Sequence, residues 1–203
     1  MPLSQNAECA GFVLAGGHSS RMGREKALLE IGGTPLVVRA ARLLQPLCSG
    51  VTIVGPPERY QHLGFACVAD ERPDLGPLGG ILTALGHTDA PWNLITACDL
   101  PHLTADWLGF LIDRAAASPA RVVLPESDSG PEPLCAVYHR DAAPAIRAQI
   151  AQGERKVMRA LHEIPVERLL PAEIRPFDPR GVLFHNLNTP EDFERARADL
   201  EAR

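Results

Sequence analysis

Basic charge, lysine and long apolar runs are all scarce in this 203-residue chain. Lys and Arg together number 20 against 25 Asp and Glu, and the net charge of -5 argues against non-specific binding to nucleic acid or an anionic membrane. No apolar stretch approaches the roughly 20 residues that a membrane-spanning helix needs. The first residues contain no basic segment followed by an apolar run, so no signal peptide is predicted and we expect a cytoplasmic protein.

Cysteine is present but never in a metal-binding or CxxC arrangement. An odd number of well-separated cysteines is typical of free thiols in a reducing compartment, where most serve as small core residues. The five are Cys9, Cys48, Cys67, Cys98 and Cys135.

Short apolar runs alternate with longer amphipathic segments along the first two thirds of the chain. The runs predict strands at 10–15, 51–55, 67–69, 94–97 and 121–124, and the segments between them predict helices at 35–47, 78–87 and 105–117. Thr34 and Thr104 are the expected N-caps of the first and third helices. This alternation is typical of an α/β fold, here a Rossmann-like three-layer sandwich with a mostly parallel sheet covered on both faces.

The pattern changes after Pro125. A turn-rich segment at 127–133 precedes a predicted strand at 134–138 and a predicted helix at 141–152, followed by a short strand at 183–187 and a last helix that begins after Thr189. We therefore expect a small antiparallel addition in the C-terminal half. No linker or repeat interrupts the sequence, and we predict a single domain over residues 1–203.

The stretch LAGGHSSRMGREK, residues 14–26, follows the first predicted strand. Ligands of open α/β sheets bind at the carboxyl ends of the strands, and a loop with few side chains lets a ligand approach backbone N–H groups. Arg21 and Lys26 could complete a cradle for phosphate oxygens. The spacing matches neither the Walker A loop nor the dinucleotide fingerprint, and spacing alone leaves open a plain surface turn with solvated arginines.

This loop resembles the signature loop of the nucleotidyltransferases related to sugar-nucleotide pyrophosphorylases. Within that superfamily, LAGG resembles the molybdenum cofactor guanylyltransferases, whereas related cytidylyltransferases typically have LAAG. Segments 27–36, 70–81, 97–101, 153–158 and 186–193 resemble the same family in the same order. The matching loop positions are Leu14, Ala15, Gly16, Gly17, Ser19, Arg21, Met22, Gly23 and Lys26.

The resemblance implies transfer of GMP from GTP to molybdenum-bound molybdopterin, with Mg²⁺ as cofactor and release of pyrophosphate. Molybdoenzymes or their chaperones would then receive the product. The residues implied in GTP binding are Leu14, Ala15, Gly16, Gly17, Lys26, Asp70 and Asp99, and those implied in molybdopterin binding are Arg155, Lys156, Asn186 and Asn188.

Asp99 is the strongest single candidate. It follows the apolar run at 94–97, so it is expected at a strand's carboxyl end, where a carboxylate near a triphosphate makes sense if a cation lies between them. Mg²⁺ prefers few protein carboxylates together with phosphate oxygens. Lys26 is one of only two lysines, and a compact ammonium suits a triphosphate. The expected catalytic set is Lys26, Arg21 and Asp99, although Asp99 could instead be a turn residue.

For the other candidate residues, a structural role remains an alternative to ligand binding. Asp70 could accept hydrogen bonds from guanine or from ribose, or could be an ordinary loop acid. The glycines at 76–80 could admit the ligand or merely begin a helix. Arg155 and Lys156 could be a solvated pair, and Asn188 could simply form a turn.

One position departs from the family pattern. Some members carry an asparagine for guanine recognition near the end of the second strand, where this chain has Val54 and Gly55. Two rival functions therefore stay open: a related nucleotidyltransferase with CTP or another phosphate acceptor, and a nucleotide-binding protein without turnover.

Overall fold

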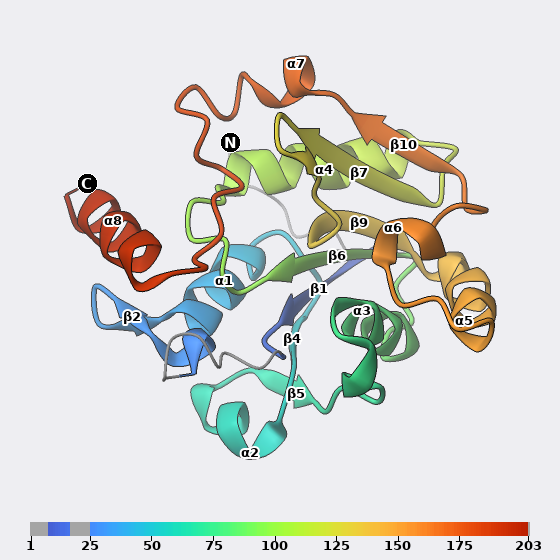
Figure 1. The fold of residues 1–203 in the computed structure, drawn as a ribbon, viewed down its shortest axis with the longest axis horizontal. Coiled ribbons are helices and arrows are strands. Elements are labelled where there is room, and N and C mark those ends of the chain that lie inside the picture. The colour runs from blue at the N-terminus through green and yellow to red at the C-terminus, as the bar shows by residue number, and fades with distance from the viewer. Residues whose placement is uncertain (1–7, 17–24, 203) are drawn as a thin grey trace.

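The computed structural model describes residues 8–16 and 25–202 of the chain. Its centre is an eight-stranded sheet in the order β10-β7-β9-β6-β1-β4-β5, with β8 paired to β7 (Figure 1). The strands of this sheet are β1 (Cys9–Leu14), β4 (Val51–Val54), β5 (Ala66–Val68), β6 (Trp92–Ala97), β7 (Val122–Ser127), β8 (Gly130–Pro131), β9 (Cys135–His139) and β10 (Val166–Leu169).

Helices cover both faces of the sheet. One buried cluster joins the sheet to α1 and α4, and a second joins it to α3, α5 and α6, which confirms the predicted three-layer α/β sandwich. The longer helices are α1 (Leu36–Leu44), α3 (Pro77–Gly86), α4 (Ala105–Ala117), α5 (Ala143–Ala151) and α8 (Pro190–Glu201); α2 (Pro57–Tyr60), α6 (Val157–Ala160) and α7 (Pro171–Ile174) are single turns. The 3-10 turns are η1 (Lys26–Leu28), η2 (Gln61–Leu63), η3 (Pro73–Leu75) and η4 (Arg140–Ala142).

Three parallel strands end at the same edge of the sheet. Leu14, the last residue of β1, is the register partner of Val54 in β4 and of Ala97 in β6. The segments that follow these strands therefore start side by side, which is where ligands of open α/β sheets bind. This edge positions the candidate site.

The antiparallel part of the sheet confirms the predicted addition in the C-terminal half. Strand β9 runs antiparallel between β6 and β7, and β8 folds back on β7. Because β9 lies next to β6, the turn that precedes β9 reaches the edge at which β6 ends: Ala97 N–H donates to the Leu134 carbonyl oxygen at 2.8 Å.

Two local predictions were wrong. Thr34 does not cap α1; it belongs with Pro35 to β3 (Thr34–Pro35), which pairs with β2 (Glu30–Ile31) in a hairpin whose Gly32 and Gly33 have φ of 59° and 70°. Two positive φ angles suit a type I′ turn, so local turn chemistry displaced the expected helix start. The segment 183–187 is a loop rather than a strand.

Two predicted helix starts hold. Thr104 accepts a hydrogen bond from Trp107 N–H at the start of α4, and Thr189 forms a capping box with Asp192 at the start of α8. All five cysteines are free, as predicted. No helix in the described part of the chain is long and apolar enough to cross a membrane.

Candidate active site

Lys26 and Asp99 form an ion pair at the edge where β1 and β6 end. The Lys26 Nζ lies 2.8 Å from Asp99 Oδ2, and the two side chains are 18% and 21% exposed. Lys26 begins η1 after the signature loop, and Asp99 follows β6 by two residues. Parallel pairing of the two strands brings these residues together across 73 positions of sequence.

The described end of the signature loop is fixed by the neighbouring strands. Ala15 N–H donates to Val54 O at 2.9 Å, and Cys98 N–H donates to Leu14 O at 3.2 Å. A Cβ built on Gly16 meets no described atom within 4 Å, so packing against the described residues does not require glycine there. Gly17 and Arg21 lie outside the described residues.

Tyr60 connects the two ends of the loop, and sequence reasoning missed this residue because no motif surrounds it. Its hydroxyl contacts the Ala15 carbonyl oxygen at 2.8 Å and also the carboxylate of Glu25, which precedes Lys26. Burial, reinforced by the Glu25 carboxylate, raises the pKa of the Tyr60 phenol, so it remains a hydrogen-bond donor. Arg59 Nη1 lies 3.2 Å from the other Glu25 oxygen. Because Tyr60 and Arg59 both hold Glu25, its negative charge is partly compensated beside the loop that is expected to bind phosphate.

Gly55 makes room for the Tyr60 ring. A Cβ at Gly55 would lie 2.7 Å from the ring's Cε2 atom, which is closer than non-bonded carbon atoms approach each other in proteins. The two residues that stand in place of the family asparagine, Val54 and Gly55, therefore support the loop: Val54 through its carbonyl and Gly55 by leaving space for Tyr60.

Asp70 holds the loop that leads to α3. Its Oδ1 accepts hydrogen bonds from Arg72 N–H at 2.9 Å and from the Thr83 hydroxyl at 3.2 Å. A Cβ at Gly79 would lie 2.1 Å from Arg72 O, so this glycine is needed for the close approach of loop and helix. One oxygen of Asp70 thus has a structural role, and the structural alternative for the glycines of 76–80 is supported at Gly79.

Arg155 and Lys156 lie on the same side as Asp70. Arg155 Nη1 is 3.5 Å from Asp74 Oδ2 in η3, and Arg72 Nε is 3.4 Å from the other oxygen of Asp74. The Glu154 carboxylate accepts both the Arg155 and Lys156 N–H groups at 2.8 Å, which fixes the turn before α6.

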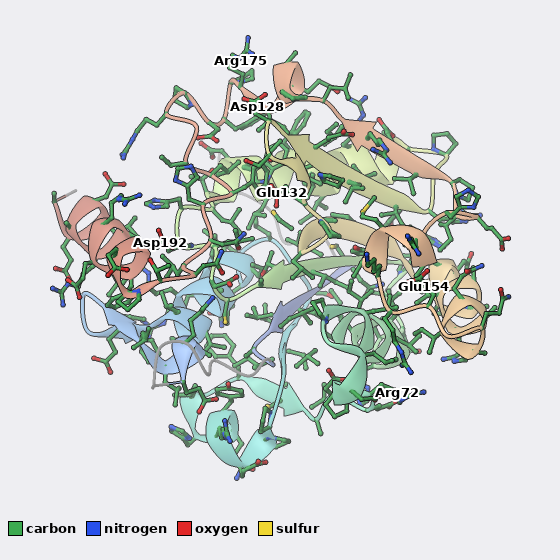
Figure 2. The ribbon with its side chains drawn as sticks, viewed as in Figure 1. Arg72, Asp128, Glu132, Glu154, Arg175 and Asp192 are labelled. Carbon is green, nitrogen blue, oxygen red and sulfur yellow. The ribbon has the colours of Figure 1, made fainter. Side chains whose placement is uncertain are left out.

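Asn186 and Asn188 lie instead beside Asp99. Leu187, between them, donates its N–H to the Asp99 carbonyl oxygen at 3.1 Å, and both asparagines line a cavity of about 460 Å³. In Figure 2, Glu154 and Asp192 mark the two segments and lie on opposite sides of the molecule. The structure therefore does not bring together the two regions predicted to bind molybdopterin.

Asp99 offers a donor set that fits magnesium bound together with a nucleotide. In residues 8–16 and 25–202, no three His, Cys, Asp or Glu side chains are grouped so as to hold a metal ion by themselves. Mg²⁺ commonly takes one or two carboxylates and fills its other positions with phosphate oxygens and water. A single carboxylate at the strand edge, next to an ammonium, suits that arrangement.

Cys98 is not a nucleophile, although it lies next to Asp99. Burial, followed by the negative charge of Asp99, raises the pKa of the Cys98 thiol to about 12. A protonated, buried thiol is a poor nucleophile. Cys98 is therefore no candidate for covalent catalysis at this site.

Comparisons with known proteins agree with this geometry. Residues 11–164 match the family model described as the MobA-like NTP transferase domain. The chain is 33% identical over 189 residues to a molybdenum cofactor guanylyltransferase of Syntrophotalea carbinolica (93% of this chain, 90% of that protein), and 38% identical over 188 residues to a probable one of Nostoc (89% and 86%).

A solved structure shows the same architecture. Molybdopterin-guanine dinucleotide biosynthesis protein A from Archaeoglobus fulgidus superposes with a TM-score of 0.83 at 27% identity, covering 96% of this chain and 100% of that one. The family model spans most of the chain, and the relatives match over nearly its full length. This chain belongs to the MobA-like NTP transferase family.

Proposed function

We propose that this protein is a Mg²⁺-dependent guanylyltransferase that transfers GMP from GTP to molybdenum-bound molybdopterin and releases pyrophosphate. The observation that carries the proposal is the Lys26–Asp99 pair, which sets an ammonium and a carboxylate at the strand edge next to the LAGG loop. The relatives named as molybdenum cofactor guanylyltransferases support the choice of nucleotide and acceptor.

The reaction is a direct displacement. An oxygen of the acceptor's terminal phosphate attacks the α-phosphorus of GTP, and the bond to the bridging oxygen breaks as pyrophosphate leaves. Because that phosphate oxygen is already ionised at neutral pH, no protein base is required. Bound Mg²⁺ would supply neutralisation of phosphate charge, with Asp99 as its protein ligand.

The residues of the chain position the reactants and balance their charge. Lys26 would place its ammonium where the triphosphate lies, and backbone N–H groups of the signature loop would donate to its phosphate oxygens. Arg21 is expected to add a second cation. Asp70 and the loop before α3 would hold the nucleoside, while Asn186 and Asn188 would contact the acceptor beside Asp99.

The fate of the product follows from the acceptor's chemistry. A finished molybdenum cofactor must pass to an apoenzyme, so we expect molybdoenzymes or their chaperones as recipients. The five free cysteines support a reducing compartment, and we propose the cytoplasm.

Calorimetry with Mg²⁺ and either GTP or CTP tests the nucleotide half. We expect tight binding of GTP, weak binding of CTP, and loss of GTP binding in Lys26→Ala but not in Arg42→Ala, which removes an exposed cation of α1. Preference for CTP would assign the protein to the cytidylyltransferases. Binding without formation of pyrophosphate in the presence of molybdenum-bound molybdopterin would support the non-catalytic alternative.

A further inference from the structure

The cavity beside Asp99 is lined by charged groups of both signs. It lies between the segment that follows Asp99, the loop at 186–188, helix α8 and the turn between β8 and β9. Because Leu187 bonds to the Asp99 carbonyl, the cavity adjoins the strand edge where the reacting phosphate must arrive. Its charged and imidazole-bearing residues are His102, Glu132, Arg180, His185, Asp192, Arg195 and Asp199.

Two of the three carboxylates in this cavity are held by contacts of the fold. Asp199 lies 2.6 Å from Arg180 Nη2 and 3.5 Å from His102 Nδ1. Asp192 accepts the backbone N–H groups of Asn188 and Thr189 at 3.2 and 3.0 Å, and so fixes the start of α8. Both carboxylates therefore have structural partners.

Glu132 differs from these two. In the described part of the chain its carboxylate forms no ion pair with a lysine, arginine or histidine, and it accepts a hydrogen bond from the Ser127 hydroxyl at 2.7 Å. Burial raises the pKa of Glu132, although Ser127 partly offsets this. A half-buried carboxylate without a cation costs free energy, and in a cavity that must admit a phosphate it also repels the ligand.

The backbone holds Glu132 firmly despite this cost. It lies between Pro131 and Pro133, whose rings fix φ on both sides. Its N–H donates to Pro125 O at 2.9 Å, and its carbonyl accepts the Cys135 N–H at 3.0 Å. Figure 2 shows Glu132 between the Asp192 and Glu154 sides of the molecule. A fixed carboxylate of this kind suits a ligand group that donates hydrogen bonds.

The proposed acceptor carries such a group. The pyrimidine half of a pterin has an N3–H and a 2-amino group on adjacent atoms, and both point in the same direction. A carboxylate accepts such a pair with its two oxygens, as it accepts the two N–H groups of a guanidinium. The phosphate at the other end of the molecule belongs at the Asp99 edge.

We propose that Glu132 selects the acceptor by binding the N3–H and 2-amino edge of its pterin ring. Ser127 orients the carboxylate, and the cations of the cavity balance the anionic remainder of the ligand. The inference rests on the proposed function, because it takes a pterin as the acceptor.

Fluorescence titration with pterin-6-carboxylate and lumazine-6-carboxylate tests the proposal directly. The two compounds differ at position 2, where lumazine has an oxygen in place of the amino group. We expect the wild-type protein to bind the pterin about tenfold more tightly, and Glu132→Gln to lose that preference, since its amide NH₂ would face the ring's donors. Equal binding of both compounds by the wild type, no binding of either, or a preference kept by Glu132→Gln would overturn the proposal.

Steady-state kinetics with molybdenum-bound molybdopterin add a second readout. Glu132→Gln is expected to raise the acceptor KM at least tenfold while the KM for GTP stays within twofold of wild type. Glu126→Gln is the matched control, because Glu126 in the same hairpin pairs with Arg168 instead. An unchanged acceptor KM would contradict the proposal for Glu132. Absence of GMP transfer by the wild-type protein would contradict the proposed function, and the titration would still decide the role of Glu132.

Folding of the variant is checked by thermal unfolding. Ser127→Ala provides an independent perturbation, since it removes the hydroxyl that orients Glu132 without changing the carboxylate. It is expected to raise the acceptor KM in the same direction by a smaller factor. No effect on the acceptor KM would exclude the orienting role of Ser127.

Discussion

The Lys26 ammonium lies 2.8 Å from the Asp99 carboxylate, so the cation expected to bind phosphate and the expected metal ligand pair with each other. Both side chains are mostly shielded from water, and each would be costly to leave alone. A triphosphate would give Lys26 anionic partners in place of Asp99. The ion pair therefore stabilises both charges at the edge of the sheet where we expect the triphosphate and the metal ion to bind.

Replacing Asp99 by Asn should separate binding from turnover. We expect kcat to fall by roughly 100-fold or more, because charge neutralisation in the transition state is lost, while GTP affinity falls by less than about tenfold. Pyrophosphate release and calorimetry measure the two effects. Asp106→Asn, which changes an exposed carboxylate in the first turn of α4, serves as the control and should match wild type. A variant Asp99→Asn with normal kcat would contradict the catalytic role.

Removing the Tyr60 hydroxyl should weaken GTP binding by disturbing the loop, with only a small effect on the stability of the fold. Tyr60→Phe keeps the ring against Gly55 but removes the contacts to Ala15 and Glu25. Loss of a buried hydrogen bond costs on the order of 1 kcal/mol, and we expect GTP to bind about five- to tenfold more weakly. Calorimetry gives the affinity, and urea unfolding gives the stability.

A second variant disturbs the same contact from the opposite side. Gly55→Ala places a Cβ 2.7 Å from the Tyr60 ring and should displace it, with the same direction of change in GTP affinity and a larger loss of stability. Wild-type affinity in Tyr60→Phe would show that the hydroxyl does not position the loop.

Two glycine substitutions should differ in their effect on stability. Gly79→Ala lies in a helix, where alanine is normally favoured by about 1 kcal/mol, yet its Cβ would meet Arg72 O at 2.1 Å. We expect a net loss of about 1–3 kcal/mol in the free energy of unfolding. Gly16→Ala meets no described atom within 4 Å, and its stability should remain within about 0.5 kcal/mol of wild type. Urea unfolding distinguishes the two.

The same Gly16→Ala protein tests the meaning of LAGG. If Gly16 selects GTP, as the family resemblance predicts, the ratio of CTP to GTP affinity rises in the variant. An unchanged ratio would show that the choice of base depends on other residues.

Glu132→Gln should change how stability depends on pH. Burial raises the pKa of Glu132 above its ordinary value of 4.5, so the folded protein holds this proton more tightly than the unfolded chain does. The stabilising effect of that proton is complete below pH 4.5 and is lost as the pH rises through the folded-state pKa. The variant, which cannot ionise here, should therefore be more stable than wild type at pH 7, with the difference shrinking towards pH 4. Thermal unfolding at several pH values measures this, and a less stable variant at pH 7 would contradict it.

Regular elements of the fold could be predicted because their signals are local. The helix at 105–117 has a clear cap in Thr104 and a buried face, and it occurs with the predicted bounds. The prediction that Thr34 caps α1 was wrong because Gly32 and Gly33, just before it, form a hairpin turn, which the rules for helix starts do not consider. The segment 183–187 is apolar enough for a strand, but Leu187 bonds to Asp99 rather than to a neighbouring strand.

The site could be predicted in part for a related reason. Asp99 and Lys26 lie next to strand ends, and strand ends of a parallel sheet meet at one edge, so sequence position was informative. Tyr60 and Glu132 lie in short turns without a motif, and their partners are 35 and 5 residues away. Nothing in the order of residues indicates which turn reaches the loop or the cavity.

The C-terminal helix is attached to the rest of the molecule through a small core of its own. Ile31, Leu36, Leu187, Phe193 and Ala196 form this cluster apart from the two that pack on the sheet, and Glu201 accepts the Gly32 N–H at 3.0 Å. Local opening requires less free energy where few apolar groups are buried. We therefore expect the amides of α8 to exchange with deuterium sooner than those of β1 or β6. One wall of the cavity beside Asp99 would then open on its own, while the strand edge that carries the reacting groups stays closed to exchange.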